Sequence, residues 1–254
     1  MRFIERNGRR YAQFEQLGGE PGLTHAFSTR PFDLSARIDA DAPRRSERRA
    51  NMARDFDLNP ARLHYCVQIH QTHIANIERG SSPDRLEGFD AAITQDTAAA
   101  LMTFSADCPL ILAYDPVQRA LGMAHASWRC CVAGIAGALV CALCERFGCE
   151  PENLLAGIGP SAGPGQYEVK QDVYDAAAQL KNRDDFFTRR GGRMFFDLWR
   201  ANRSQLEQAG IRTGNIECAE ICTMTHNDVF YSFRREGRGC GHFALIAALR
   251  EESA

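Results

Sequence analysis

Residues 100–127, ALMTFSADCPLILAYDPVQRALGMAHAS, decide the fold because they contain three short apolar runs in direct succession. The runs cover residues 100–106, 109–114 and 120–126. Apolar runs of this length with turn residues between them are typical of buried β-strands. Residues 131–147 follow, and their apolar side chains recur at the i, i+4, i+7, i+8 spacing of a helix. The segment therefore predicts consecutive strands followed by a helix.

The rest of the chain continues this mixture of strands and helices. Further strands are expected at 22–29, 64–70, 153–158, 215–222, 229–234 and 243–249, and further helices at 46–57, 170–181 and 198–209. No internal repeat and no linker rich in Pro, Gly or Ser divides the chain. Residues 1–254 are therefore expected to form a single domain. Its surface excursions are expected at 31–43 and 182–193, where substrate-contacting groups often lie.

The charge balance argues against a polyanionic partner. The chain has 30 Lys plus Arg against 32 Asp plus Glu, which gives a formal net charge of −2. Such a chain has no general electrostatic attraction to nucleic acid or to an anionic membrane. The basic run RRSERR at 44–49 is short and lies at the start of an expected helix. A solvated helix face is therefore favoured over a nucleic-acid patch.

The N-terminal sequence and the cysteines indicate a reducing compartment. MRFIERNGRRYAQFEQL carries charges every few residues and has no apolar run of signal-peptide length. No stretch of the chain approaches the apolar length of a transmembrane span. Several of the ten cysteines have apolar neighbours, which favours reduced thiols that serve as small core residues. We therefore expect a soluble cytoplasmic protein.

Three metal-type side chains stand at or near the ends of expected strands. His70 ends the run HYCVQIH, Cys108 ends LMTFSADC, and His125 lies late in ALGMAHAS. His70 and Cys108 are 38 residues apart, and His125 follows after another 17. Zinc fingers and HExxH sites hold their ligands much closer together in sequence. Spacing alone therefore favours buried, hydrogen-bonded core residues over a metal site.

Five blocks of sequence occur in an order known from one protein family. They are QIHQTH at 68–73, ADCPLILAYDP at 106–116, MAHASWRCCVAGI at 123–135, GIGPSAGPGQYEV at 157–169 and CTMTHNDVFYSFRREG at 222–237. Together they resemble the YfiH-type laccase-domain family, formerly called multicopper polyphenol oxidases, whose motifs include QVHG, ADC, AHAGWRG and FYSYRRDG. The resemblance covers about residues 22–249. It implies an α+β fold of mixed β-sheets flanked by helices in one YfiH-like laccase domain, similar to bacterial toxin deamidases.

The resemblance also implies a metal site. By position, the metal-binding His, Cys and His of the family fall on His70, Cys108 and His125. The family usually binds Zn²⁺ there, and copper is the less expected metal. Three protein ligands leave a fourth position for water or substrate, which distinguishes a catalytic zinc site from a closed structural one. We therefore expect His70, Cys108 and His125 to be metal ligands and catalytic residues.

The activity implied by the resemblance is zinc-dependent purine nucleoside chemistry. The family is associated with phosphorolysis of adenosine, inosine or methylthioadenosine to the free base and ribose 1-phosphate. Deamination of adenosine is its second associated activity. The expected partners are therefore a small-molecule purine nucleoside and phosphate, with no nucleic acid and no membrane. The chain is expected to act as a monomer or a weak homo-oligomer.

Phosphorolysis needs cationic groups beside the ribose. Arg30, Arg129 and Arg234, or its neighbour Arg235, are candidate substrate-binding residues because a guanidinium group matches phosphate bidentately. A surface or interface ion pair is the alternative role for each of them. His242 is a further candidate substrate-binding residue.

The sequence departs from the family pattern close to the expected site. Ser127 and Cys130 stand where AHAGWRG has glycine, Asp33 stands where the family carries Asn, and His242 stands where it carries Arg. Because glycine often marks a close approach of backbone to ligand, its loss beside His125 can narrow the pocket. The three expected ligands are all present, but these departures leave the substrate open.

Three other functions fit parts of the sequence. A Cys–His hydrolase or amidase, for instance one that edits peptidoglycan precursors, would use Cys108 as nucleophile and His125 as its base. A copper-dependent polyphenol oxidase follows from the older family name. However, the seven mostly isolated histidines do not supply the HxH patterns of true laccases. A non-enzymatic ligand binder is the third alternative, suggested by the altered pocket residues.

Overall fold

One half of the protein is a seven-stranded mixed sheet. The computed structural model describes residues 1–37, 39–82 and 85–251. The strands of this sheet are β1 (Arg2–Arg6), β2 (Arg9–Gln13), β3 (Leu23–Ser28), β4 (Leu63–Val67), β6 (Arg85–Glu87), β8 (Ala100–Ser105) and β16 (Phe243–Leu249). They stand in the order β1-β2-β3-β16-β8-β4-β6. All neighbours are antiparallel except β4, which pairs in parallel with β8 and β6.

The other half contains a six-stranded mixed sheet. Its strands are β5 (Ile74–Ile77), β7 (Ala91–Thr94), β9 (Leu110–Asp115), β10 (Ala120–His125), β11 (Leu155–Ile158) and β15 (Ile216–Cys218), in the order β15-β11-β9-β10-β7-β5. The central strands are antiparallel, whereas the two edge pairs, β15 with β11 and β5 with β7, are parallel. Between β8 and β9 the chain passes from the seven-stranded sheet to the six-stranded sheet, and Cys108 lies in this connection.

The two large sheets face each other across the main hydrophobic core. Leu245 and Ala247 of β16 belong to a buried cluster that also contains Leu112 and Met123 of the opposite sheet. Ile246, between them in sequence, is also buried but packs on the outer side of its sheet. Successive side chains of a strand point to opposite faces, so a strand buried on both faces is a continuous apolar run. This explains why residues 243–249 form a strand over their whole predicted length.

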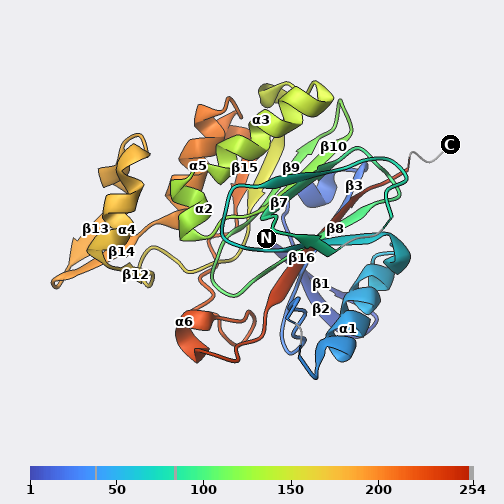
Figure 1. Ribbon diagram of the computed structural model, residues 1–254, viewed down its shortest axis with the longest axis horizontal. Coiled ribbons are helices and arrows are strands. Elements are labelled where there is room, and N and C mark those ends of the chain that lie inside the picture. Colours follow the sequence, from blue (N-terminus) through green and yellow to red (C-terminus); the bar gives the residue numbers. More distant parts are fainter. Residues whose placement is uncertain (38, 83–84, 252–254) are drawn as a thin grey trace.

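Helices cover the outer faces of both sheets, which gives four layers. Helix α1 (Ala42–Asp55) packs Met52 and Ala53 on the seven-stranded sheet. Helices α3 (Ile135–Phe147) and α5 (Leu198–Gln208) pack Leu139 and Leu206 on the six-stranded sheet. Figure 1 shows α1 and α3 on opposite sides of the strands.

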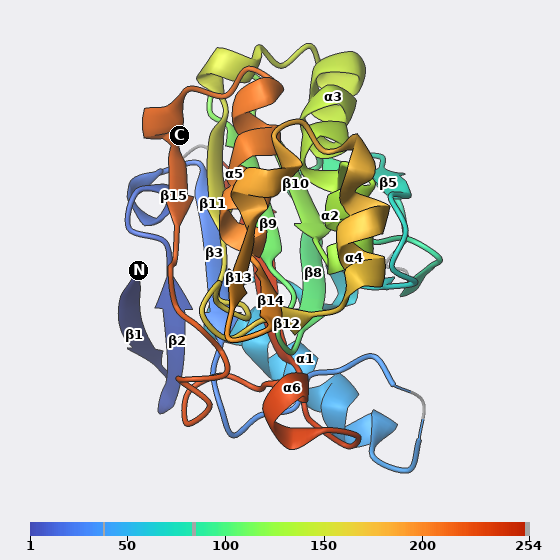
Figure 2. The same ribbon diagram turned by 90° about the vertical axis from the view of Figure 1, so that its left-hand side faces the viewer.

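A small three-stranded sheet lies beside the sandwich. It consists of β12 (Glu168–Val169), β14 (Arg193–Phe196) and β13 (Phe187–Arg190), in that order. Helix α4 (Gln171–Ala176) packs with it, and Phe196 joins this unit to Cys131 of α2 (Trp128–Val132). The last helix, α6 (Phe233–Glu236), lies below it in Figure 2.

The predicted fold class, mixed sheets flanked by helices, is confirmed, but several predicted elements are shorter or different. The expected strand at 229–234 is wrong, because the buried side chains of Phe230 and Tyr231 anchor a turn that leads into α6. Only Ile216–Cys218 of the expected strand at 215–222 pairs. The expected helix at 131–147 is interrupted by Gly134, whose φ of +86° begins α3. The extent of the domain, residues 1–254, stays a prediction.

The strands that the sequence did not reveal are short or polar. β1 (RFIER) and β13 (FTRR) are exposed along most of their length and contain no apolar run. They are held by backbone pairing to β2 and β14 rather than by burial. Apolar periodicity reports burial, so strands of this kind escape it.

The cysteines behave as the sequence predicts. All ten are free thiols, and most are buried or partly buried. No helix among the described residues has both the length and the apolar character needed to cross a bilayer.

We predict that His25 makes the fold sensitive to acid. Burial, together with the positive charges of Arg2 and Arg250, lowers the pKa of His25 from 6.5 to about 3. The unfolded chain then binds the extra proton first, so the free energy of unfolding should fall as the pH decreases from about 6.5 towards 3. The expected slope is about 1.4 kcal/mol per pH unit from this group.

Urea unfolding between pH 4 and 7 measures this slope. The variant His25→Gln keeps an acceptor for the amide of Phe14, which donates to His25 Nε2 at 3.0 Å, but cannot be protonated. It should flatten the pH profile relative to the natural chain. Equal slopes in the two proteins would refute the assignment.

Candidate functional site

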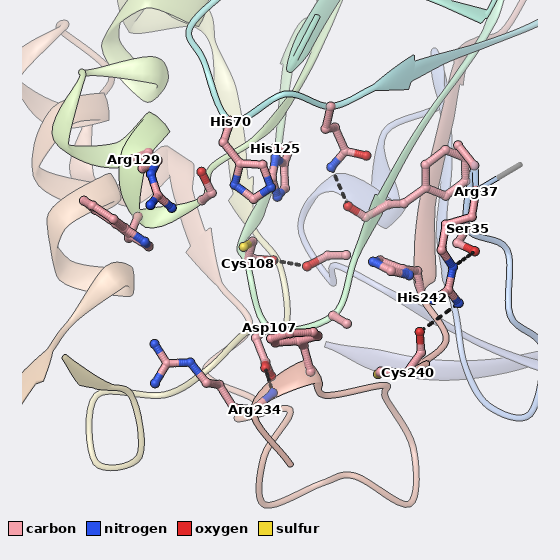
Figure 3. A pocket seen from close by; sticks show the side chains of 18 of the residues that line it. Ser35, Arg37, His70, Asp107, Cys108, His125, Arg129, Arg234, Cys240 and His242 are labelled. Carbon is pink, nitrogen blue, oxygen red and sulfur yellow. Dashed lines mark hydrogen bonds between the residues drawn. The ribbon is translucent and has the colours of Figure 1, made fainter. Parts of the chain in front are cut away.

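A cavity of about 770 Å³ opens at the end of the sandwich where β4, β8 and β10 finish. Its lining comes from the turns after these strands, from α2 and α6, and from the loop before α1. His70, Cys108 and His125 all line it, and Figure 3 shows the three side chains converging. The fold thus brings into one cavity three residues that are far apart in sequence.

The carboxylate of Asp90 organises this end of the cavity. It is fully buried just before β7. The amides of Ile69 and Gln71 donate to its Oδ2 at 3.0 and 2.9 Å. Its Oδ1 accepts from the amide of His70 at 3.1 Å and from Nδ1 of His125 at 2.8 Å. Burial raises the pKa of this carboxyl, but the hydrogen bonds from His125 and the turn amides outweigh burial and lower it overall. Asp90 is therefore an ionised acceptor.

The bond to Asp90 fixes the tautomer of His125. An ionised carboxylate only accepts, so the proton of the neutral imidazole must lie on Nδ1 and the lone pair on Nε2. The backbone of His125 is also tied, because its amide donates to the carbonyl of Asp90 at 2.7 Å. A histidine held in this way offers a correctly oriented nitrogen to a metal ion.

His70 and Cys108 are presented by tight turns. His70 has a φ of +62°, a conformation that a non-glycine residue keeps only when its surroundings enforce it. The three amides bound to Asp90 provide that enforcement. The ring of His70 meets the ring of His125 edge-on, with centroids 5.0 Å apart. Burial, and then the charge of Asp107, raises the pKa of the Cys108 thiol, so the free thiol is neutral at pH 7.

A second, more compact group of metal-type side chains shares His125. Among the described residues, Asp90, His125 and Cys130 have ligand atoms that all lie within 4.8 Å of one another. The predicted trio of His70, Cys108 and His125 is more widely spread. However, both oxygens of Asp90 already accept hydrogen bonds, and Cys130 Sγ lies 2.9 Å from Ser127 Oγ. This buried Asp-His-Cys group could hold a metal, at the cost of those bonds.

Two of the predicted arginines lie in the cavity wall. The guanidinium group of Arg129 stacks on Trp128 at 4.3 Å and has no carboxylate partner among the described residues. Arg234 stacks on Tyr167 at 4.5 Å, and its Nη1 donates to the carbonyl of Glu168 at 2.8 Å. Figure 3 shows both side chains on the same side of Cys108. They can hold an anion beside the histidines.

Asp107 supports the site from behind. Its Oδ2 accepts from the amide of Arg234 at 2.7 Å, and its Oδ1 accepts from Thr223 Oγ1 at 2.6 Å. The carboxylate therefore fastens α6 to the turn that carries Cys108. Asp107 is therefore a supporting residue of the site.

Arg30 does not line this cavity. Its guanidinium group forms an ion pair with Glu236 and lies over the ring of Tyr231 at 4.2 Å. Arg30 therefore has the alternative role given above, that of a partner in a structural ion pair. Arg235 does not contribute to the lining of this cavity either.

The residues that depart from the family pattern contact one another in pairs. The amide of His242 donates to Asp33 Oδ1 at 2.9 Å. Burial lowers the pKa of His242 to about 4, so its ring is neutral in the cavity wall. Ser127 caps α2 by accepting from the amide of Cys130 at 3.3 Å, and Cys130 Sγ lies 3.8 Å from Asp90 Oδ1. Cys130 thus fills space directly behind His125.

Sequence reasoning missed Asp90 and the opposite cavity wall. Asp90 stands alone in GFDAAIT, where its position before a short apolar run was the one available signal. Arg37 lines the far wall, where its Nη2 donates to the carbonyl of Cys240 at 2.9 Å. It lies within the expected surface excursion at 31–43.

Comparison with known proteins finds a matching family and several relatives. Residues 23–250 match the family described as multi-copper polyphenol oxidoreductase laccase. The purine nucleoside phosphorylase of Bacteroides thetaiotaomicron is 31% identical, with 90% of this chain and 92% of the relative covered. The purine nucleoside phosphorylase of Deinococcus radiodurans is 34% identical, with 91% of each covered.

A solved structure shows the fold to which the chain is similar. The crystal structure of the hypothetical protein YfiH from Bacillus licheniformis superposes with a TM-score of 0.85 at 27% identity, covering 90% of this chain and 93% of that one. The predicted YfiH-like fold is therefore confirmed.

We predict that Asp90→Asn loosens this end of the protein and changes the state of His125. The amide keeps one acceptor but loses the charge, so the free energy of unfolding should fall by about 3 kcal/mol. The Nδ1 proton of His125 loses its ionised acceptor, so part of the ring population should move to the Nε2-protonated tautomer. Urea unfolding and ¹⁵N NMR of the imidazole measure the two effects.

Asp96→Asn is the matched control. Asp96 is also buried, follows β7, and accepts from Arg62, Gly80 and Ala98 away from the cavity. Its loss should lower stability without altering the His125 tautomer. An identical NMR response in both variants would contradict the role given to Asp90.

Proposed function

The chain belongs to the multi-copper polyphenol oxidoreductase laccase family, and we propose that it is a zinc-dependent purine nucleoside phosphorylase. Relatives named purine nucleoside phosphorylase support an enzymatic role of this kind. The observation that carries the proposal lies in the cavity. The side chains of His70 and Cys108 and the Nε2 atom of His125 have no hydrogen-bond partner within residues 1–37, 39–82 and 85–251. Beside them lies Arg129, without a carboxylate partner in the same part of the chain.

The donor set suits Zn²⁺. Two imidazoles and one thiol are borderline to soft donors of the kind that zinc prefers. His125 is held in the tautomer that a ligand needs, because Asp90 occupies its other nitrogen. When bound, zinc would neutralise the thiolate of Cys108, lower the pKa of a bound water and polarise a substrate atom. Asp90 would then support a ligand instead of binding the metal itself.

The arginines supply the second requirement of phosphorolysis. In this reaction a phosphate oxygen forms a bond to C1′ of the ribose while the bond from C1′ to the purine nitrogen breaks. The electron pair of that bond leaves with the base, and the products are the protonated free base and ribose 1-phosphate. Arg129, with support from Arg234, is placed to hold the phosphate by charge-assisted hydrogen bonds.

The size of the cavity agrees with two substrates. A volume of about 770 Å³ leaves room for a nucleoside and a phosphate ion together. Phe104 and Tyr167 give apolar surface for the purine and ribose. Deamination of adenosine at the same site is the second activity in this proposal.

The Cys–His hydrolase is less well supported. Burial raises the pKa of the Cys108 thiol, whereas a nucleophilic cysteine needs a lowered one. No hydrogen bond joins Cys108 Sγ to His70 or His125 in the described part of the chain, so no base activates the thiol. A multicopper oxidase also lacks support, because His125 is the one histidine in the compact metal-type group found among those residues. We propose that the enzyme works in the cytoplasm, with small molecules as its partners.

We predict that His70→Ala, Cys108→Ser and His125→Ala each remove zinc and activity together. Zinc content should fall from about one per chain to near zero, and phosphorolysis of adenosine should slow by roughly a hundredfold or more. Elemental analysis measures the metal. Chromatography of adenine, ribose 1-phosphate and inosine measures the two reactions.

Cys141→Ser is the thiol control, because Cys141 is exposed on α3 and lies outside the cavity lining. It should keep both zinc and turnover. Turnover by metal-free protein that thiol alkylation stops would reject the zinc enzyme in favour of the hydrolase.

We predict that Arg129→Gln weakens the use of phosphate. Loss of a charge-assisted hydrogen bond is worth about 1.5–3 kcal/mol, so the KM for phosphate should rise roughly ten- to a hundredfold. The KM for adenosine should change much less. Arg79→Gln, which removes the same charge at an exposed turn outside the cavity, is the control. Equal kinetics of Arg129→Gln and Arg79→Gln would remove Arg129 from the phosphate site.

A further inference from the structure

A second pocket lies on the opposite side of the loop that lines the catalytic cavity. It has a volume of about 240 Å³ and is formed by the start of β2, the end of β3, the loop after β3 and the first half of α1. The linings of the two pockets have no residue in common. The proposed phosphorolysis makes no use of this second pocket.

Guanidinium groups dominate the second pocket. Arg9, Arg44 and Arg48 turn their side chains towards it, and Glu47 is the one carboxylate among its lining residues. Like charges so close together repel one another, and a chain with a net charge of −2 has no general need for such a concentration. The arrangement therefore indicates a ligand that supplies negative charge.

Two of these arginines have no acidic partner. The guanidinium group of Arg44 forms no hydrogen bond or ion pair with any residue that the structure describes. Arg48 donates to the carbonyl of Asp33 at 3.3 Å and has no carboxylate partner within the same residues. Both lie on α1, whereas Arg9 reaches the pocket from β2 and is held by Asp55 at 2.7 Å.

The remaining lining prepares the pocket for a small organic anion. The ring of Phe32 lies between Arg9 and Arg48, whose guanidinium carbons are 5.8 and 6.0 Å from its centroid. Cation–π contacts of this kind fix the direction in which the guanidinium groups point. Asn51 accepts from Arg54 through its Oδ1, which leaves its amide hydrogens to donate into the pocket. Glu47 can accept from hydroxyl groups of a ligand.

We propose that this pocket binds a phosphate monoester of sugar-phosphate size. The phosphate group accounts for the arginines, because guanidinium binds phosphate bidentately. The hydroxyl groups of a sugar account for Asn51 and Glu47. A volume of about 240 Å³ admits a pentose phosphate, whereas larger nucleotides would extend into solvent.

One loop, between β3 and α1, separates the second pocket from the catalytic cavity. Phe32 and Leu34 face the second pocket, whereas Ser35 and Arg37 of the same loop face the cavity. Arg48 donates to the carbonyl of Asp33 at 3.3 Å. A ligand that binds Arg48 would therefore contact a residue that holds the loop of the far cavity wall.

Isothermal titration calorimetry of the full chain tests the proposal, with ribose 5-phosphate and inorganic phosphate as probes. We expect ribose 5-phosphate to bind, and the double variant Arg44→Gln/Arg48→Gln to weaken its binding at least tenfold. The single variant Arg44→Gln should give a smaller loss in the same direction, which protects the test against misfolding of the double variant. Binding of inorganic phosphate with an affinity equal to that of ribose 5-phosphate would overturn the assignment to a sugar phosphate.

Two further variants separate this pocket from the catalytic cavity. Arg129→Gln removes phosphate binding in the catalytic cavity, so ribose 5-phosphate that still binds to this variant occupies the second pocket. Arg79→Gln/Arg212→Gln removes the same charge as Arg44→Gln/Arg48→Gln at exposed positions outside both linings and should leave the affinity for ribose 5-phosphate unchanged. The proposal is overturned if neither probe binds, if binding to Arg44→Gln/Arg48→Gln is undiminished, or if Arg129→Gln no longer binds ribose 5-phosphate.

Discussion

The buried carboxylate of Asp90 is the interaction on which the candidate site depends. It lies before β7 of the six-stranded sheet, yet three of its bonds go to the turn after β4 of the seven-stranded sheet. A fourth holds His125. An ionised group that is fully buried is tolerated only when its lone pairs are satisfied, and these donors satisfy them. One side chain thus joins the two sheets and orients both histidines.

The far wall of the cavity is built by buried arginines of α1. Arg45 donates to the carbonyl of Arg37 at 2.7 Å, and Arg49 donates to the carbonyl of Ser35 at 2.8 Å. These bonds shape the loop between β3 and α1. The basic run at 44–49 therefore has two roles. Its buried members, Arg45 and Arg49, hold the cavity wall, whereas the exposed Arg44 and the partly buried Arg48 face the second pocket.

The residues that depart from the family pattern form specific contacts near the site. Ser127 and Cys130 replace two glycines, and their side chains meet at 2.9 Å behind His125. Asp33 accepts from the backbone amide of His242 in the far wall, a bond that does not depend on the histidine ring. The contact between Ser127 and Cys130 therefore depends on the replaced side chains, whereas the bond to Asp33 does not depend on the side chain at position 242.

The sequence alone determined the class of fold, because strands such as 243–249 are buried on both faces and so form continuous apolar runs. It also supplied His70, Cys108 and His125, although only through a resemblance of ordered motifs. Tertiary structure decided what surrounds them. Asp90 lies 35 residues from His125, and no local pattern reports a bond across that distance. Arg30 is a comparable case, since its pairing with Glu236 depends on a turn that apolar periodicity took for a strand. Apolar periodicity indicates which residues are buried. It does not indicate which distant segments are joined by hydrogen bonds, and bonds of that kind hold the site together.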